Sequence, residues 1–366
     1  MPIMFNEFNP NLCSRKQWKL FHEFRKSRHI ETGSNDSILS DDDFEKLLKK
    51  GCIDEFTIKF SIFENKNYEK QIGFLSFSYL NENSVSYKGN EDICNARIII
   101  LRPYRRKGYA TILLRKIVEL MQEHKKNTVK CYTIDENGRN FLKAINAKIN
   151  LEGIDNKLYI KDINWNMIDI WIKEGQKRSN GTNLTFYEKI PEGIIREYSK
   201  IYTEIFNQQP FDELTQGDKI FTPESLKIRE EEFEELGGKI MTAVTFEKSK
   251  EISGLTEVIY VPSRKSVISQ GLTGVRQKYR GKGLGKWLKA VMLLKIRSKF
   301  PQVETIETGN ANSNIPMLSI NFRLGFKKEK KRMFYQISVE LIKEYLNKCD
   351  QDSKNLTQLE KKFICM

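Results

Sequence analysis

Two short stretches decide how this chain is interpreted: Tyr104-Arg105-Arg106-Lys107-Gly108-Tyr109-Ala110 and Tyr279-Arg280-Gly281-Lys282-Gly283-Leu284-Gly285. Each follows a short apolar strand pattern and leads directly into a segment with helical spacing of apolar residues. Small residues in such a turn let the main chain approach a phosphate closely, and the N–H groups at the helix start point towards it. Three basic side chains lie at the second turn: Arg280, Lys282 and Lys286. Both turns therefore predict a pyrophosphate site, although such a turn can also be a simple joint between loop and helix.

The elements around the two turns repeat in the same order. In the first half we expect helices at 16–29 and 40–50, strands at 56–64, 69–80 and 97–101, a helix at 109–124, a strand at 129–134, a helix at 139–145 and a strand pair ending near residue 162. In the second half we expect a strand at 184–190, helices at 191–207 and 223–236, strands at 239–247, 251–261 and 267–275, a helix at 283–299, a strand at 303–308, a helix at 315–324 and a strand at 331–337. A repeat of this length predicts two domains of ordinary size.

Turn-rich sequence at 178–183 separates the two copies. We therefore predict four segments: an N-terminal domain at 1–164, a linker helix and turn at 165–183, a C-terminal domain at 184–338, and a helical tail at 339–366. The predicted fold class is α/β, with a mixed, mostly antiparallel twisted sheet flanked by helices in each domain.

Composition restricts the functional classes. The chain of 366 residues is 39% hydrophobic and 30% charged, which is typical of a globular protein able to bury a core. It has no long apolar run and no signal-peptide pattern at its start, so we expect a cytoplasmic protein without a membrane partner. Six widely spaced cysteines and three histidines (His22, His29 and His124) form no metal-ligand spacing, so we expect ordinary thiols, surface histidines and no metal.

The net charge of +14 would attract polyanions such as nucleic acid, anionic lipid or a nucleotide cofactor. The base composition of the genome can also enrich a protein in lysine and asparagine, and this explains the same charge balance equally well. The basic runs at 102–107 and 327–332 belong to no known nucleic-acid-binding motif. We therefore expect them to face solvent, and we do not expect a nucleic-acid partner.

The turns match neither the dinucleotide fingerprint nor the P-loop. The pattern Arg-x-x-Gly-x-Gly/Ala between a strand and a helix instead resembles the acyl-coenzyme A signature of the GNAT superfamily of N-acetyltransferases. The order of elements in both halves resembles that fold, so the resemblance covers nearly the whole chain. The second half, with Thr273-Gly274-Val275 before its turn and 310–326 after it, looks like the tandem GNAT group that includes mycothiol synthase and its bacterial relatives.

The resemblance implies acetyl-coenzyme A, or another acyl-coenzyme A, as cofactor. The backbone of Thr273, Gly274 and Val275 would pair with the pantetheine arm, and the loop Arg280, Gly281, Lys282, Gly283, Leu284, Gly285, with Lys286, would hold the pyrophosphate. Asn314 matches an asparagine that helps to hold the arm, and it can equally be a helix N-cap. A possible second site is formed by Arg105, Arg106, Lys107, Gly108, Tyr109 and Ala110.

Direct attack of an amine on a thioester needs a base and an oxyanion donor, and sometimes an acid for the thiolate. The resemblance implies Glu257 as the base, because relatives often have a carboxylate at this place in the strand, facing the acyl centre. A glutamate in an otherwise apolar strand is either solvent-facing or partly buried with a raised pKa, and Glu304 and Glu307 are alternatives. The family's usual acid, a tyrosine, is replaced by Asn321. Tyr260 and Tyr335 are more distant substitutes.

The first half has Ser76 where the second has Glu257, so we predict that the C-terminal domain is catalytic and the N-terminal domain is not. The predicted function is N-acyl transfer to the amine of a small molecule, by a monomer or homodimer. Two alternatives stay open at this point: acylation of a protein or RNA amine, and a non-catalytic acyl-coenzyme A sensor or interaction protein.

Overall fold

The computed structural model describes residues 3–33, 38–52 and 54–364, and within them the two halves have the same order of elements. The first half contains β1 (Met4–Glu7), α1 (Arg15–Thr32), α2 (Asp41–Lys50), β2 (Glu55–Phe63), β3 (Gln71–Leu80), β4 (Ile93–Ile100), α3 (Tyr109–Glu123), β5 (Thr128–Thr133), α4 (Glu136–Ala144) and β6 (Ile149–Tyr159). The second half contains β7 (Asn183–Tyr187), α6 (Glu192–Asn207), α7 (Pro223–Glu235), β8 (Lys239–Phe246), β9 (Ile252–Tyr260), β10 (Val267–Val275), α8 (Leu284–Lys299), β11 (Thr305–Ala311), α9 (Ile315–Leu324) and β12 (Lys327–Ser338). The repeat and the mixed, mostly antiparallel sheet expected from the sequence are confirmed.

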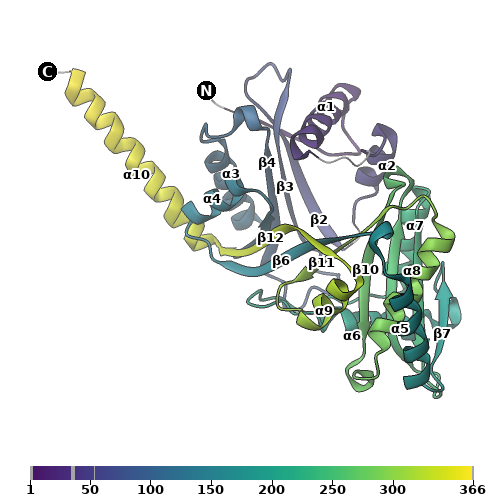
Figure 1. The fold of residues 1–366 in the computed structure, drawn as a ribbon. Coiled ribbons are helices and arrows are strands. Elements are labelled where there is room, and N and C mark those ends of the chain that lie inside the picture. Colours follow the sequence, from purple (N-terminus) through teal and green to yellow (C-terminus); the bar gives the residue numbers. More distant parts are fainter. Residues whose placement is uncertain (1–2, 34–37, 53, 365–366) are drawn as a thin grey trace.

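The two halves share one twelve-stranded sheet, because each half gives its last strand to the other. The strand order is β1-β2-β3-β4-β5-β12-β6-β11-β10-β9-β8-β7. Strand β12 pairs with β5 of the first half, and β6 pairs with β11 of the second (Figure 1). The expected strand pair ending near residue 162 is instead this one long strand, β6. The predicted bounds at 164 and 184 therefore mark the repeat in sequence, while the sheet itself runs through both halves.

The hydrophobic cores follow the exchanged strands. The first core packs α3 and β2–β5 together with Met333, Tyr335 and Ile337 of β12. The second packs α8 and β8–β11 together with Leu158 of β6. Each half thus buries apolar side chains that the other half supplies, which favours folding of the two halves as one unit.

Helix α5 (Trp165–Arg178), expected as part of a linker, packs closely against α8. Ile168, Trp171 and Gly175 are its buried residues. A Cβ at Gly175 would lie 2.5 Å from the Cβ of Trp287, so the two helices cross at a distance that only glycine permits. Helices α5 and α8 therefore cover one face of the second half's sheet, and α6 and α7 cover the other (Figure 1).

The C-terminal tail contains one long helix, α10 (Val339–Ile364). Its first turns pack on the N-terminal half through Val339, Ile342 and Leu346, and the helix then extends away from the sheet (Figure 1). The remaining predicted tail residues, 365 and 366, lie outside the described residues.

Candidate active site

The two turns at 104–110 and 279–285, predicted to bind pyrophosphate and called the phosphate turns below, have the same backbone conformation. Arg106 and Gly281 have φ angles of 63° and 86°, and Gly108 and Gly283 have φ angles of 77° and 81°. The left-handed conformation costs an ordinary L-residue about 1–2 kcal/mol, so Arg106 is held there by the rest of the fold. The shape that lets a backbone approach a phosphate is thus kept in both halves.

The arginine of each turn closes its own loop. Arg280 Nε donates to the carbonyl oxygen of Val275 at 3.1 Å, and Arg105 Nε donates to that of Ile100 at 2.9 Å. The Nη2 atom of Arg280 donates to Gln208 Oε1 at 2.6 Å. Arg280 therefore shapes the turn, in addition to the positive charge expected from it.

The charges around the two turns differ. Arg105 and Lys107 of the first turn lie 3.7 and 3.1 Å from the carboxylates of Glu31 and Glu64. In the second turn, Lys282 lies 3.9 Å from a carboxylate and Lys286 lies against the ring of a tryptophan. The second turn therefore presents more uncompensated positive charge to an anion.

Both turns lead into helices without an acidic residue in the first turn. In contrast, α2 begins with Asp41, Asp42 and Asp43. Acidic residues at a helix start complement the positive end of the helix dipole. At α3 and α8 no acidic side chain of the first turn complements that positive end.

Strand β10 has an open edge beside the second turn. It pairs with β11 only over 267–269 and 305–307, and the two strands then diverge. Residues 273–275 keep their partners on β9 and have none on the β11 side among the described strands. An open strand edge can pair with an extended, amide-bearing arm, as predicted for this segment.

A β-bulge interrupts β10 and has no counterpart in β4. The register with β9 shifts between Gln270 and Thr273, whereas β3 and β4 pair without a shift. A Cβ at Gly271 would lie 2.4 Å from Glu257 Oε1, so the bulge requires glycine there. Bulges are common beside active sites, where they redirect side chains.

Glu257 lies beneath this bulge and is fully paired. Its side chain is 2% exposed. Arg229 Nη1 and Nη2 each donate at 2.9 Å, Tyr202 donates its hydroxyl at 2.9 Å, and the N–H of Leu272 donates at 3.2 Å. Glu257 is therefore not the solvent-facing residue that was one of the two expectations, and both of its oxygens already accept hydrogen bonds.

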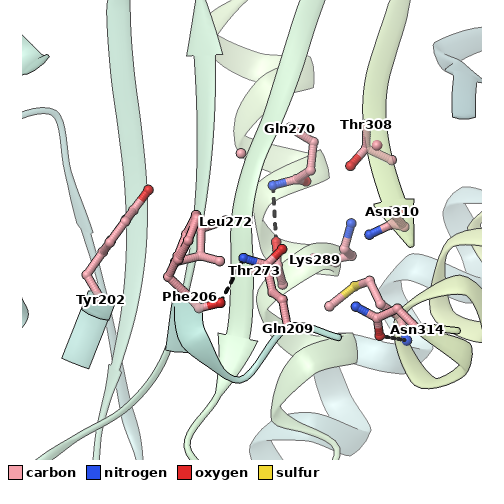
Figure 2. A pocket seen from close by; sticks show the side chains of 13 residues that line it. Tyr202, Phe206, Gln209, Gln270, Leu272, Thr273, Lys289, Thr308, Asn310 and Asn314 are labelled. Atoms are coloured by element: carbon pink, nitrogen blue, oxygen red, sulfur yellow. Dashed lines mark hydrogen bonds between the residues drawn. The ribbon is translucent and has the colours of Figure 1, made fainter. Parts of the chain in front are cut away.

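A cavity of about 190 Å³ opens where β10 and β11 diverge. Its walls come from α6, β10, β11, α8 and α9, and Figure 2 shows their side chains converging on one space. Six of the thirteen lining residues have uncharged amide or hydroxyl side chains: Gln209, Gln270, Thr273, Thr308, Asn310 and Asn314. We call this space the acyl cavity.

The sequence-based prediction missed Lys289, which lies in this cavity. It is 2% exposed and projects from α8 between β10 and β11 (Figure 2). Burial lowers the pKa of its amine to about 7. Lys289 Nζ lies 5.4 Å from the centre of the Phe326 ring. Among the described residues no carboxylate lines the cavity beside it.

A second cavity, of about 460 Å³, continues from the acyl cavity into the first half. The two share Phe206, Gln209, Gly309 and Asn310. Its further walls come from β5, β6 and β12 and from the loop after α6. We call this larger space the interdomain cleft.

Charged and aromatic side chains line the interdomain cleft. Asp155 accepts from Arg332 Nη2 at 2.9 and 3.0 Å. Lys130, whose pKa is lowered to about 8 by burial, donates to Gln216 Oε1 at 2.7 Å. Tyr132 and Phe334 pack with ring centroids 5.7 Å apart.

Other predicted positions have clear structural places. Asn314 is the N-cap of α9, accepting from the N–H of Met317 at 3.4 Å, and it also lines the acyl cavity. Asn321 is buried and donates to Asn310 Oδ1 at 2.9 Å. Tyr335 lines the interdomain cleft, whereas Tyr260 stacks on Phe300.

The alternative acids lie away from the cavities. Glu304 is exposed. Glu307 accepts from Arg264 at 2.6 Å and lies 3.1 Å from Lys157, and these hydrogen bonds outweigh burial and hold its pKa low. Neither carboxylate is among the residues that line the two spaces.

His22 is buried and bonded to Glu45 at 3.2 Å, which corrects the expectation of a surface residue. Among the described residues the cysteines form no disulfide, and Cys365 lies outside them. Among the described residues no group of three metal-binding side chains comes together, and no helix is long and apolar enough to cross a bilayer.

Comparison with known proteins gives one family match. Residues 21–143 match the model of the acetyltransferase (GNAT) family. No curated protein matches the chain. The family match lies in the first half, whereas the bulge and the acyl cavity lie in the second.

Solved structures resemble the whole chain. A tandem GNAT protein from the clavulanic acid biosynthesis pathway matches with a TM-score of 0.71 and 17% identity, covering 92% of this chain and 99% of that one. A GCN5-related N-acetyltransferase from Sphaerobacter thermophilus matches with a TM-score of 0.59 and 13% identity, covering 92% and 96%. At these identities the likeness concerns the fold, and a specific relation to mycothiol synthase stays a prediction.

Family match, repeated fold and paired phosphate turns agree. Residues 21–143 match the acetyltransferase (GNAT) family, and the chain as a whole has the fold of a tandem GNAT protein.

Proposed function

We propose that the chain is an N-acyltransferase that moves an acetyl or similar acyl group from an acyl-coenzyme A to the amine of a small molecule, with the coenzyme in the C-terminal half. The acyl cavity carries this proposal, because it lies between the open edge of β10 and the diverging β11. The pyrophosphate binds at 280–285 and Lys286, where the helix start and its basic residues favour an anion. The pantetheine arm pairs with 273–275 and brings the thioester to the acyl cavity.

The acceptor enters through the interdomain cleft. Its volume of about 460 Å³ is in the range typical of small-molecule sites, and it adjoins the acyl cavity along four shared lining residues. Asp155 can hold an ammonium group, and Tyr132 and Phe334 offer apolar contact. This geometry favours a small amine over a folded protein or an RNA as the acceptor.

The chemical step is direct attack of the amine on the thioester carbonyl carbon. Asn310 is placed to donate to the developing oxyanion, because its Oδ1 is held by Asn321 and its amide nitrogen points into the acyl cavity (Figure 2). Glu257 acts here as a positioning residue: through Leu272 and Tyr202 it fixes the bulge that forms one wall. Its role as the base stays a prediction.

A matched pair of substitutions tests which half holds the coenzyme. Gly285 and Ala110 occupy the same place in the first turns of α8 and α3, and a Cβ at Gly285 meets only ordinary contacts at 3.5 Å or more. Aspartate in a first helical turn stabilises the helix, so both Gly285→Asp and Ala110→Asp should fold. We expect Gly285→Asp to weaken acetyl-coenzyme A binding by at least about tenfold, since a lost charge-assisted hydrogen bond alone is worth that much.

Isothermal titration calorimetry on the intact chain measures this, with thermal melting as the folding control. One site per chain in the wild type and in Ala110→Asp, and weak binding in Gly285→Asp, supports the proposal. Loss of binding in Ala110→Asp alone would assign the coenzyme to the half that matches the family model. If the wild type does not bind, the acyltransferase function proposed for the second half is refuted.

A further inference from the structure

Lys289 differs from the other residues of the acyl cavity in its chemistry. It is the one lysine among the described residues that line this space, and no carboxylate lines it. Its neighbours from β10, β11 and α9 are uncharged: Gln270, Thr273, Thr308, Asn310 and Asn314. The titratable group that α6 contributes is Tyr202, whose hydroxyl donates to Glu257. No carboxylate therefore favours the protonated form of this buried amine, and the Phe326 ring, 5.4 Å from Nζ, is a weak substitute for one.

The protonation state of Lys289 follows from this setting. Burial lowers its pKa to about 7, whereas an ordinary lysine has a pKa of about 10.4. At pH 7.5 the neutral, nucleophilic form is therefore on the order of 10²–10³ times more abundant for Lys289 than for a surface lysine. Part of this advantage is lost because a less basic amine is also a weaker nucleophile.

We propose that Lys289 is a self-acylation site, at which the protein transfers an acyl group from bound acyl-coenzyme A to its own lysine amine. The inference rests on the proposed function, because it requires the thioester to reach the acyl cavity. The arm that pairs with 273–275 ends at the bulge, and the bulge and Lys289 line the same space. No external acceptor is then needed for the amine to meet the thioester.

The step balances without any further reactant. Lys289 Nζ attacks the thioester carbonyl carbon, the C–S bond breaks as the C–N bond forms, and the amine proton passes to the departing thiolate. The products are an N-acyl-lysine and the free coenzyme thiol. The amide is uncharged and bulkier than the amine, so it occupies part of a cavity of only about 190 Å³. Acylation of Lys289 therefore reduces the binding of a second acyl-coenzyme A.

The experiment needs no knowledge of the natural acceptor. The whole chain is incubated with acetyl-coenzyme A, and acetylation of each lysine is followed over time by peptide mass spectrometry. We expect Lys289 to be acetylated at least about tenfold faster than the median surface lysine, at a rate that rises with pH and levels off above about 7. In Lys289→Met, the early single acetylation seen in the intact mass should disappear. In Lys295→Met, a change two turns further along α8, it should persist.

Two parallel measurements separate this inference from the proposed function. Calorimetry reports whether acetyl-coenzyme A binds, and acetyl phosphate serves as a small acetylating probe that needs no coenzyme site. If the coenzyme binds while Lys289 reacts no faster than surface lysines, self-acylation is refuted and the proposed function stands. If the coenzyme does not bind while acetyl phosphate labels Lys289 preferentially, the proposed function fails and self-acylation from coenzyme fails with it. The wild-type peptide map decides the question even if Lys289→Met does not fold.

Discussion

The two halves of this molecule have phosphate turns of the same conformation but different residues and strand geometry beside them. Residues 106 and 108 repeat the backbone of 281 and 283, and each turn is closed by its arginine in the same way. Beside the second turn, however, β10 has a bulge and Lys289 lies in a cavity. At the matching place in the first half β4 is regular, and Leu114 is buried in the core. The comparison teaches that a fold can keep a binding turn while the neighbouring chemistry changes.

The hydrogen-bonded network around Glu257 also distinguishes the second half from the first. Glu257, Arg229 and Tyr202 are bonded together beneath the bulge. The first half has Ser76 at the position of Glu257, in a regular strand pair. The half that matches the family model is therefore the one without the bulge, the cavity lysine and the buried ion pair. The family signal and the candidate chemistry lie on different sides of the repeat.

The largest expected effect on stability comes from replacing Lys289 of the second half with leucine, the residue at the matching position of the first half. Lys289→Leu copies Leu114 and removes a buried amine whose pKa is about 7 in the folded state against about 10.4 unfolded. Because the unfolded chain binds more protons between these values, wild-type stability rises with pH across that window. The substitution should therefore add about 4 kcal/mol to the free energy of unfolding at pH 7 and only about 1 kcal/mol at pH 10.

Urea unfolding at a series of pH values measures this gain. Lys295→Leu on the same helix is the control, because Lys295 is only partly buried and should show little pH-dependent gain. A gain for Lys289→Leu that is equal at pH 7 and pH 10 would show that Lys289 is not a strained, buried amine.

The second expected effect concerns the ion pair that only the second half has at this position. Arg229→Met leaves the Glu257 carboxylate buried without its bidentate partner, and such a loss costs about 3 kcal/mol or more. Adding Glu257→Gln removes the charge, so the double variant should recover most of that stability. Thermal or urea unfolding of the single and double variants checks this. Equal stability of both would mean that the carboxylate is not the source of the penalty.

Local patterns explain what could be predicted from the sequence. The turns, the helix starts and the N-cap at Asn314 depend on residues close together in the chain, and the repeat doubled each signal. The exchange of β6 and β12 could not be read in this way, because which strand pairs with β5 depends on tertiary packing. The hydrophobic pattern of both strands is the same whichever half they join.

For two residues of the site, likewise, the sequence could not predict the surroundings that tertiary packing gives them. The family resemblance predicts a carboxylate at Glu257, but nothing in the sequence indicates its partner Arg229, which lies 28 residues away on α7. Lys289 did leave a signal: it stands between Leu288 and Ala290, on the buried face of α8. A lysine on an apolar helix face can also extend its side chain until the amine reaches solvent. The sequence therefore could not predict that Lys289 is buried in a cavity, because that cavity depends on the divergence of β10 and β11.

The smallest expected effect tests whether the left-handed backbone of the first turn lowers the stability of the chain. Arg106 has the left-handed backbone that glycine holds at 281, and its side chain is exposed. Arg106→Gly should therefore stabilise the chain by about 1 kcal/mol, since the relief of backbone strain exceeds the extra entropy of glycine in the unfolded state. Arg106→Ala removes the same side chain but keeps the strain, so it should give no gain. If alanine stabilises as much as glycine, loss of a positive charge is the cause instead. A gain specific to glycine, with acetyl-coenzyme A binding unchanged, would mean that the fold maintains a strained phosphate turn in a half that does not bind the coenzyme.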